Sequence, residues 1–490
     1  MKYMHHRAAQ LSSVVLLCSL ILAPAAFATN GMNMEGYGPV ATGMGGASMA
    51  YDNGTAAMMN NPATLSLMQS KARLDLAIGF LGPDVNSSMA GMPDAKSSAD
   101  LFMMPAFGYV RKGAQITYGL GVFAQGGMGT EYAADSFLAA GSGDKVRSEV
   151  AMGRVLIPLS YEVNKNLNVA ASLDFVWASM DLKMALTGQQ FFNLAGMDMT
   201  PGAIQQEYGT ASGSMLTAFG GMMGMLDPTD PVNYGRFDFS DSSDFSGKSK
   251  GTGFAGKLGA TYKVNDKLTL GAAYHSKTSI SDLEANGATV SFGINADTGI
   301  LGGGLPSGVY TPVVVPVTGT IKVKDFQWPQ MIGLGGAYQV NPKLLLVADY
   351  KWINWKNVMK DFKMTFTADA SQANPMAAGL ASTQLDATLY QNWDDQNVFM
   401  LGAGYNFTNE FVGRIGVNIA NNPIPDKYEN PLFPAIIENH YMLGAGYAIN
   451  KANTIDFSYT YAPEVKVTNG QGVATSHSQN NMQILYSHLF

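Results

Sequence analysis

Hydrophobic and polar residues alternate along most of the chain with a period of two. In residues 454–461 the odd positions are Ile, Phe, Tyr and Tyr, whereas the even positions are Thr, Asp, Ser and Thr. Residues 268–274 and 411–419 alternate in the same way. This period, with one apolar face, is typical of a strand that buries one side. The chain is therefore predicted to be all-β.

A short unit recurs in which a strand ends in tyrosine and a tight polar turn follows. It is clearest at 258–268 and 334–344, and weaker copies lie at 159–165, 401–409 and 443–451. Asn, Asp, Gly and Pro suit such turns because they accept the backbone angles that a turn requires. Tyrosines at strand ends are typical of transmembrane barrels, where they lie at the membrane interface.

We predict a transmembrane antiparallel barrel of fourteen strands, an even number as in single-chain bacterial barrels. Tight turns alternate with longer loops, which places both termini on the side of the tight turns. The predicted strands are 71–81, 100–111, 114–126, 146–162, 167–185, 252–263, 267–284, 316–339, 343–368, 383–406, 410–420, 436–448, 452–468 and 475–490.

Residues 30–68 do not fit this pattern. They contain seven Gly and seven Met but only two charged residues, Glu35 and Asp52. The stretch is too short and too rich in glycine to form its own core. We therefore predict that residues 29–70 form a small hatch of short helices that plugs the lumen of a barrel made by residues 71–490.

The composition favours an outer-membrane protein. Charged residues make up 14% of the chain, against about 25% in soluble domains. Residues 1–28 combine a basic start, a short apolar run and Ala26-Phe27-Ala28, as in a cleaved secretory signal peptide. The only cysteine, Cys18, lies in that run. The net charge of −7 argues against a nucleic-acid partner.

The apparent catalytic motifs lack their structural context. Residues 251–258 match GxGxxG and most of a Walker A loop, but a strand follows where phosphate binding needs a helix. The mature histidines are scattered without the spacing of metal ligands. We predict no catalytic residue, metal or cofactor, and no enzymatic activity.

Two long loops are unusually apolar. The loop at about 186–250 is rich in Phe and Met, and the loop at about 285–315 carries further aliphatic residues. Together they are predicted to form a landing site for a hydrophobic small molecule, unless they only pack on each other. The candidate ligand-binding residues in these loops are Phe191, Phe192, Met222, Met223 and Leu301.

Several motifs, in order along the chain, resemble the FadL/TodX (OmpP1) family. They are Gly36-Tyr37-Gly38, Gly43 to Ala47, Asn61-Pro62-Ala63, Gly126 to Tyr132, Tyr274-His275-Ser276, Tyr350 to Trp355 and Asn422 to Asp426. The family transports long-chain fatty acids and aromatic hydrocarbons across the outer membrane. The resemblance implies a fourteen-stranded barrel with an N-terminal hatch and a sideways exit at an inward kink of the third strand.

Carried onto this chain, the resemblance places the kink at Gly126 and Gly127, and the hatch residues that contact it at Asn61, Pro62 and Ala63. Lys183 corresponds to a basic group that would meet a carboxylate, and its absence from the site would favour a neutral hydrocarbon. The expected partners are the hydrophobic ligand, outer-membrane lipid and lipopolysaccharide, and the barrel assembly machinery. We expect a monomer.

The sequence therefore predicts passive uptake of hydrophobic molecules, either long-chain fatty acids or related hydrocarbons, through a hatch-gated barrel. An aromatic-hydrocarbon channel, a general porin and an outer-membrane lipid hydrolase are the alternatives.

Overall fold

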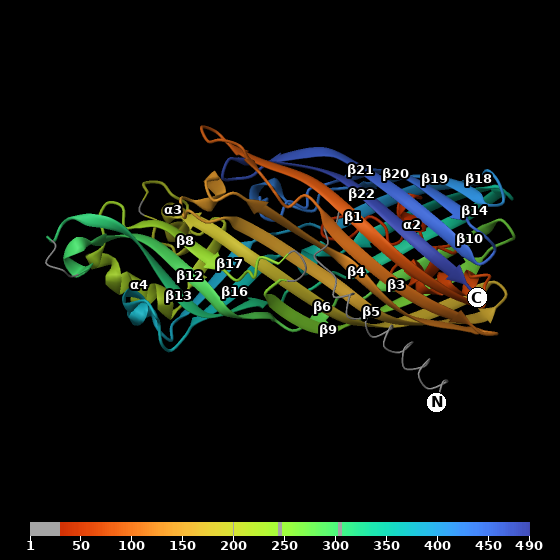
Figure 1. The fold of residues 1–490 in the computed structure, drawn as a ribbon, viewed down its shortest axis with the longest axis horizontal. Coiled ribbons are helices and arrows are strands. Elements are labelled where there is room, and N and C mark those ends of the chain that lie inside the picture. The colour runs from red at the N-terminus through yellow and green to blue at the C-terminus, as the bar shows by residue number, and fades with distance from the viewer. Residues whose placement is uncertain (1–29, 199, 244–246, 302–305) are drawn as a thin grey trace, which may run out of the picture.

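The computed structural model describes residues 30–198, 200–243, 247–301 and 306–490. Neighbouring strands pair antiparallel, and the sheet closes on itself because β1 pairs with β3 on one side and with β22, the last strand, on the other. Figure 1 shows the resulting long barrel, with the C-terminus at the end where the tight turns lie. The predicted signal peptide, residues 1–28, falls outside the described residues.

The strands form one sheet. They are β1 (Ala72–Met89), β2 (Ala95–Lys96), β3 (Phe102–Lys112), β4 (Ile116–Tyr132), β5 (Val146–Asn164), β6 (Leu167–Thr187), β7 (Gly209–Ser212), β8 (Val232–Asp238), β9 (Ser249–Lys263), β10 (Leu268–His275), β11 (Ser279–Ile280), β12 (Leu283–Asp297), β13 (Tyr310–Lys324), β14 (Met331–Asn341), β15 (Leu344–Ile353), β16 (Asp361–Ala368), β17 (Gln384–Tyr390), β18 (Gln396–Asn406), β19 (Phe411–Ala420), β20 (Asn439–Ala448), β21 (Asn453–Thr468) and β22 (Val473–Leu489).

The helices are short. They are α2 (Pro39–Thr42), α3 (Gly188–Leu194), α4 (Ser214–Met222), and the 3₁₀ turns η1 (Gly54–Met58), η2 (Pro62–Leu67), η3 (Phe137–Ala139), η4 (Met223–Met225), η5 (Thr298–Leu301), η6 (Trp355–Asn357), η7 (Pro375–Leu380) and η8 (Asp426–Tyr428). Within the described ranges, none has the length and apolar character needed to cross a membrane.

The predicted number of fourteen strands is wrong, because the sheet formed by the described residues contains twenty-two strands, some of them as short as two residues. Several of the long predicted strands are divided: the segment predicted at 343–368 is β15 and β16, separated by a turn at Trp355. Trp328 and Trp393 lie at two similar breaks, and all three indoles are buried. Further strands such as β7 and β8 come from a predicted loop. Alternation continues on both sides of a break, so a period of two does not reveal it.

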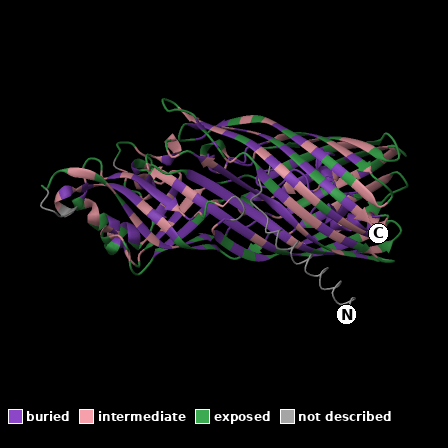
Figure 2. Cartoon of the chain, in the orientation of Figure 1, coloured by how far each residue is buried: buried purple, intermediate pink, exposed green. Residues whose placement is uncertain are grey.

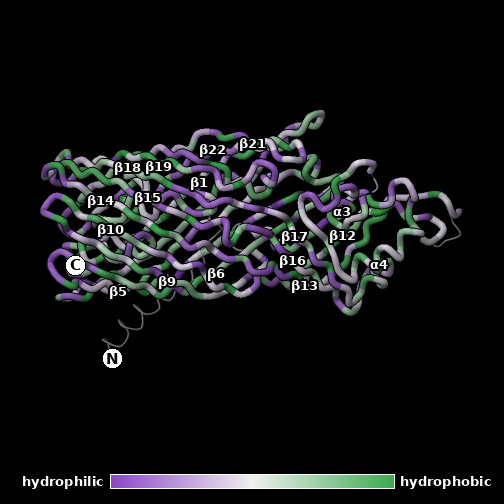
Figure 3. The backbone as a smooth tube through the Cα atoms, turned by 180° about the vertical axis from the view of Figure 1, so that it is seen from behind, coloured by the Kyte–Doolittle hydropathy of each residue, from purple (hydrophilic) through white to green (hydrophobic). Residues whose placement is uncertain are grey.

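The outer face of the barrel carries exposed aliphatic and aromatic side chains. Four leucines are each more than half exposed: Leu258, Leu334, Leu401 and Leu443. The residues beside them in sequence are largely polar or glycine. The recurring tyrosines lie next to the tight turns and are also exposed: Tyr118, Tyr161, Tyr262, Tyr338, Tyr405 and Tyr447. Figure 2 shows exposed and buried residues alternating along these strands, and Figure 3 the matching alternation in hydropathy. This face suits lipid.

The end of the barrel opposite the tight turns is extended. β8, β12, β13, β16 and β17 continue the wall beyond the other strands, and α3 and α4 lie among them (Figure 1). Phe191 of α3 packs edge-to-face against Phe219 and Phe292, with ring centroids 5.8 and 5.5 Å away. The apolar loop residues therefore pack together at this end and belong to the same hydrophobic core as the rest of the barrel.

Candidate functional site

Residues 30–68, here called the N-terminal segment, lie inside the barrel and are almost entirely buried. The Asp349 carboxylate of β15 accepts the backbone N–H groups of Ser48 and Met49 at 2.5 and 2.9 Å. The fit is close, because a Cβ added to Gly45 would lie 2.5 Å from the Val417 carbonyl oxygen. Glycine is needed where backbone meets backbone, which explains the unusual composition of this segment.

Asn61, Pro62 and Ala63 begin η2 and hold the N-terminal segment to the wall. The Asn61 amide donates to the carbonyls of Met49 at 2.7 Å and Ala260 at 3.1 Å, and its oxygen accepts the Ala63 N–H. Gly259 leaves room for them, since a Cβ there would lie 2.2 Å from Asn61 Oδ1. Among the described residues no hydrogen bond joins these three to Gly126 or Gly127. The predicted contact with the kink is thus replaced by one with β9.

The barrel wall has a gap between β3 and β4, here called the window. The two strands pair only from Lys112↔Thr117 to Phe107↔Val122. Beyond that point β3 pairs with β1 alone and β4 with β5 alone. Residues 102–106 and 123–130 therefore have no ladder between them in the described chain. The wall therefore lacks backbone pairing between β3 and β4 along this stretch.

A β-bulge shapes the window. The register between β4 and β5 shifts between Ala124 and Gly126, so Gln125 is an extra residue. Gly126 has φ of 157°, which glycine adopts readily because it has no Cβ. An odd residue moves every following side chain to the opposite face. Met128 consequently points into the lumen and Glu131 away from it.

The start of the N-terminal segment covers the window from inside. The Gly127 N–H donates to the Met32 carbonyl at 3.2 Å, and the Tyr37 hydroxyl donates to the Gln125 carbonyl at 2.5 Å. Burial raises the pKa of Tyr37, with Glu35 adding to the rise and Arg154 opposing it, so the hydroxyl keeps its proton. Residues 32–37, rather than 61–63, thus meet the kink that the sequence placed at Gly126 and Gly127.

Asn33 joins two walls of the barrel. Its amide oxygen accepts the Gln125 side-chain N–H at 2.8 Å and the Trp328 indole N–H at 2.7 Å. Trp328 in turn stacks edge-to-face on Trp355, which stacks on Trp393. The stacked indoles at the breaks in the long strands therefore support the start of the N-terminal segment through Asn33.

Three cavities lie within the described part of the barrel, at its extended end, in its interior and at the window. An outer cavity of about 420 Å³ is bounded by α3, η8 and the end of β6. Gln391 lines both this cavity and an inner one of about 20 Å³. A third, of about 40 Å³, lies at the window against Met34, Tyr37 and Phe123. The residues that line the inner cavity are Met32, Met128, Val150, Met180, Phe326, Met359, Phe362, Gln391 and Phe433.

Four of the predicted ligand-binding residues, Phe191, Phe192, Met222 and Met223, do not line the outer cavity. Phe191 is buried in the core of the extended end, and Phe192 is packed against that core. Met222 and Met223 are partly buried where α4 meets η4. Leu301 ends η5, and its side chain is outside the described residues. Other residues of α3, among them Gln190 and Leu194, line the cavity instead.

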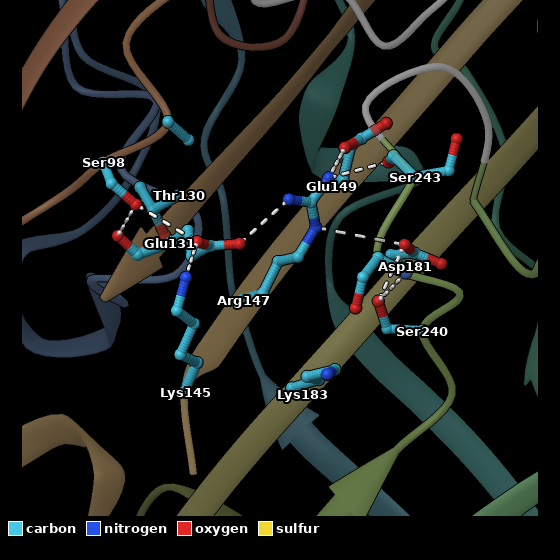
Figure 4. A network of polar contacts seen from close by, with 12 residues as sticks. Ser98, Thr130, Glu131, Lys145, Arg147, Glu149, Asp181, Lys183, Ser240 and Ser243 are labelled. Carbon is cyan, nitrogen blue, oxygen red and sulfur yellow. Dashed lines mark hydrogen bonds and ion pairs between the residues drawn. The ribbon is translucent and has the colours of Figure 1, made fainter. Parts of the chain in front are cut away.

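Lys183 does not reach the lumen. On β6 it alternates with the buried Leu182 and Met184, and its ammonium lies 4.0 Å from the Asp238 carboxylate of β8. Figure 4 shows it beside a polar network that includes Glu131, Arg147 and Asp181. None of the described residues that line the inner cavity is charged. The basic group implied by the resemblance is therefore not placed to meet a carboxylate inside the barrel.

Sequence reasoning missed Met32, Asn33, Tyr37, Gln125 and Met128. The alternation from Ile116 is lost at Ala124-Gln125-Gly126, and that loss was the available signal for a bulge. Nothing in the sequence pairs Asn33 with Trp328, because 295 residues separate them.

These features define a class: an outer-membrane barrel with a buried N-terminal segment, apolar cavities and a gap in its wall. The sequence model of the family described as outer membrane protein transport protein (OMPP1/FadL/TodX) matches residues 15–487. The chain belongs to this family. It is an outer-membrane transport protein and not an enzyme, as predicted, and its apolar cavities make hydrophobic compounds its class of substrate.

Solved structures agree with this assignment. The toluene transporter TodX of P. putida is 28% identical with a TM-score of 0.76, and the match covers 93% of this chain and 99% of that one. The toluene transporter TbuX of Ralstonia pickettii is 30% identical with a TM-score of 0.71, over 94% of this chain and 99% of that one.

One curated protein is more similar over a shorter stretch. It is the uncharacterized protein in the phosphoenolpyruvate carboxykinase gene 5′ region of Chlorobium limicola, 49% identical over 88 residues. The match covers 18% of this chain and 43% of that protein, so the chain spans less than half the length of this relative.

Proposed function

We propose that the protein takes up small neutral hydrocarbons of the monoaromatic kind rather than long-chain fatty acids. The observation that carries this proposal is the lining of the inner cavity, which consists of Met, Phe and Val side chains with one amide and no cation. A carboxylate would lose its hydration there without gaining a partner. A neutral hydrocarbon gains about 25 cal/mol for each Å² of apolar surface removed from water.

The names of the two solved relatives support the aromatic class, since both are toluene transporters. The flexible, unbranched methionines Met32, Met128, Met180 and Met359 suit a cavity that must widen around ligands of different shape. Lys427 lines the outer cavity, but it is paired with Glu207 at 3.0 Å and is half exposed. It therefore gives little support to a carboxylate substrate.

The proposed route runs from the outer cavity past Gln391 to the inner cavity, and then sideways through the window. In this proposal residues 29–70 are the hatch. Asn61, Pro62 and Ala63 anchor it to β9, and residues 32–37 are the part that moves. Hydrogen bonds between Met32, Asn33 and Tyr37 on one side and Gln125 and Gly127 on the other hold that part to β4, so a local shift that breaks them can open the window without releasing the rest.

Uptake of radiolabelled toluene and oleate by cells that lack or express the protein tests the proposal. We expect faster toluene uptake and unchanged oleate uptake. Faster oleate uptake alone would reassign the substrate to fatty acids, and no change for either compound would refute the proposal. Ion conductance in planar bilayers addresses the general porin, for which a large, steady conductance is required.

A further inference from the structure

We propose that the ion pair between Glu131 and Arg147, here called the clasp, forms the outer edge of the window and limits the size of molecule that leaves through it. The inference rests on the proposed sideways route, and it assigns to two residues a role in selectivity. It starts from the polar network in Figure 4, which the transport route itself does not use.

The clasp lies on the outer face of the wall. Arg147 and Glu149 alternate on β5 with the lumen-facing Ser148 and Val150, and they share their face with Ile157, which is 56% exposed. Glu131 joins them only because the bulge at Gln125 has turned the end of β4 around. If Gln125 were paired in a regular ladder instead of bulging out of it, Glu131 would face the lumen. The same bulge thus opens the window and supplies the group that bounds it.

Arg147 connects three strands and a loop. Its guanidinium donates to Glu131 of β4 at 3.0 Å, to Glu149 of its own strand, and to the Ser243 carbonyl at 2.8 Å. Its Nε lies 3.9 Å from the Asp181 carboxylate of β6. The Arg147 side chain is 7% exposed, and the planar fork of arginine suits several carboxylates at once. β4, β5 and β6 are therefore tied together at this height.

The backbone of Glu131 is hydrogen-bonded to Ser97 and Ser98 on the other side of the window. Its carbonyl accepts the Ser98 N–H at 2.8 Å, and its own N–H donates to the Ser97 hydroxyl at 3.1 Å. Ser97 in turn donates its N–H to the Val85 carbonyl of β1 at 2.9 Å. These bonds close the wall again beyond the gap. The window is consequently framed by the Phe107↔Val122 pair at one end and by Glu131 at the other.

The remaining charges around Glu131 favour this closed state. Lys145 donates to the second carboxylate oxygen at 2.8 Å, so both oxygens are occupied by cations. If the carboxylate is neutralised, the end of β4 loses both cations, and the gap can lengthen toward the outer surface.

The test compares a small and a large hydrocarbon, toluene and pyrene, in cells that express the protein. We expect Glu131→Gln to keep toluene uptake within twofold of the wild type and to raise pyrene uptake at least fivefold. Glu410→Gln, an exposed carboxylate at a tight turn, makes the same change in charge and is expected to alter neither. Gel mobility before and after heating confirms that each variant is folded.

A disulfide variant tests whether Glu131 limits the size of the window or only stabilises the fold. In Ser98→Cys/Glu131→Cys the cross-link should restore the low pyrene uptake of the wild type, and reduction should release it. An unchanged ratio of pyrene to toluene in Glu131→Gln, or the same ratio in the oxidised and reduced double variant, would overturn the clasp. Failure of the wild type to take up toluene would instead refute the proposed function.

Discussion

The lumen differs sharply between its two halves. Toward the extended end, the inner cavity is lined by Met and Phe side chains. Toward the tight turns, buried ions face the N-terminal segment: Asp174 binds both Arg154, at 2.8 Å, and Lys257, and all three side chains are fully buried. A second buried pair joins Arg414 to Asp456 at 2.8 Å.

This difference indicates where a hydrocarbon can go. The apolar half can hold it, whereas the charged half is filled by the N-terminal segment and offers ionised groups that cannot give up their partners cheaply. The window lies on the apolar side of this boundary, where Met128 of β4 lines the inner cavity and Phe123 lines the cavity at the window. Lateral exit is the route that avoids the charged half.

The largest effect is expected from deleting Gln125. The deletion removes the bulge and lets β4 continue in register without the bend that holds it away from β3, so the window should close, although Met128 keeps its pairing with Val150. Toluene uptake should fall to the level of cells without the protein, measured with labelled toluene. Gln125→Ala keeps the residue count and is the matched control, for which we expect substantial uptake to remain. Normal uptake after the deletion would show that the bulge is not needed.

Asp174→Leu should lower the stability of the fold by disrupting the ion pairs in the charged half of the lumen. It leaves Arg154 and Lys257 buried without their anion, and removing one partner of a buried ion pair costs about 3–5 kcal/mol. Unfolding by heat or denaturant in detergent measures this loss. Asp84→Asn affects an exposed pair with Lys96 and should change stability little. Equal stability of the two variants would contradict the assignment of this half as the structural one.

Phe362→Lys should reduce the difference between the apolar and the charged half of the lumen by adding a cation to the inner cavity. We expect toluene uptake to fall about tenfold, since an apolar ligand would have to displace a hydrated charge, a cost of about 1.4 kcal/mol for each factor of ten. Phe362→Leu keeps the cavity apolar and should retain most uptake. A gain in oleate uptake by the lysine variant would support the absence of a cation as the feature that excludes carboxylates.

The smallest expected effect concerns pH at the outer cavity. Burial, aided by the nearby Asp426, raises the pKa of Glu429 to about 8, although the Thr475 hydroxyl donates to it. The folded loop therefore binds a proton that the unfolded loop releases near its ordinary value, and the loop loses stability as pH rises toward 8. Hydrogen exchange of residues 429–437 should increase a few-fold from pH 6 to pH 9.

Glu429→Gln keeps the neutral form at every pH and should abolish this increase. If the exchange of residues 429–437 rises equally in the variant after correction for the intrinsic pH dependence, Glu429 is not the group responsible.

Much of the barrel could be predicted from the sequence. The alternation at 454–461 and the recurring tyrosines follow from a wall that faces lipid on one side, which constrains every second residue locally. The family resemblance also placed a kink at Gly126 and Gly127. The fourteen-strand count failed because breaks such as the one at Trp355 leave the alternation intact on both sides.

The partners of each residue could not be predicted in the same way. Pro62 and Lys183 were expected at the kink and in the ligand site, yet Pro62 lies against β9 and Lys183 outside the lumen. Gln125 bulges out of the ladder between β4 and β5, so the later side chains of β4 point to the faces opposite to those that regular alternation predicts.

The sequence by itself determined a lipid-facing β-sheet, an N-terminal segment that cannot fold alone, and the family. The first two depend on local periodicity and composition, and the family depends on the order of short motifs along the chain. Only the tertiary structure decided that residues 32–37 cover the window, that the inner cavity holds no charge, and that Glu131 meets Arg147 outside the wall. Those facts depend on strand register and on contacts between residues far apart in the chain, which no local pattern records.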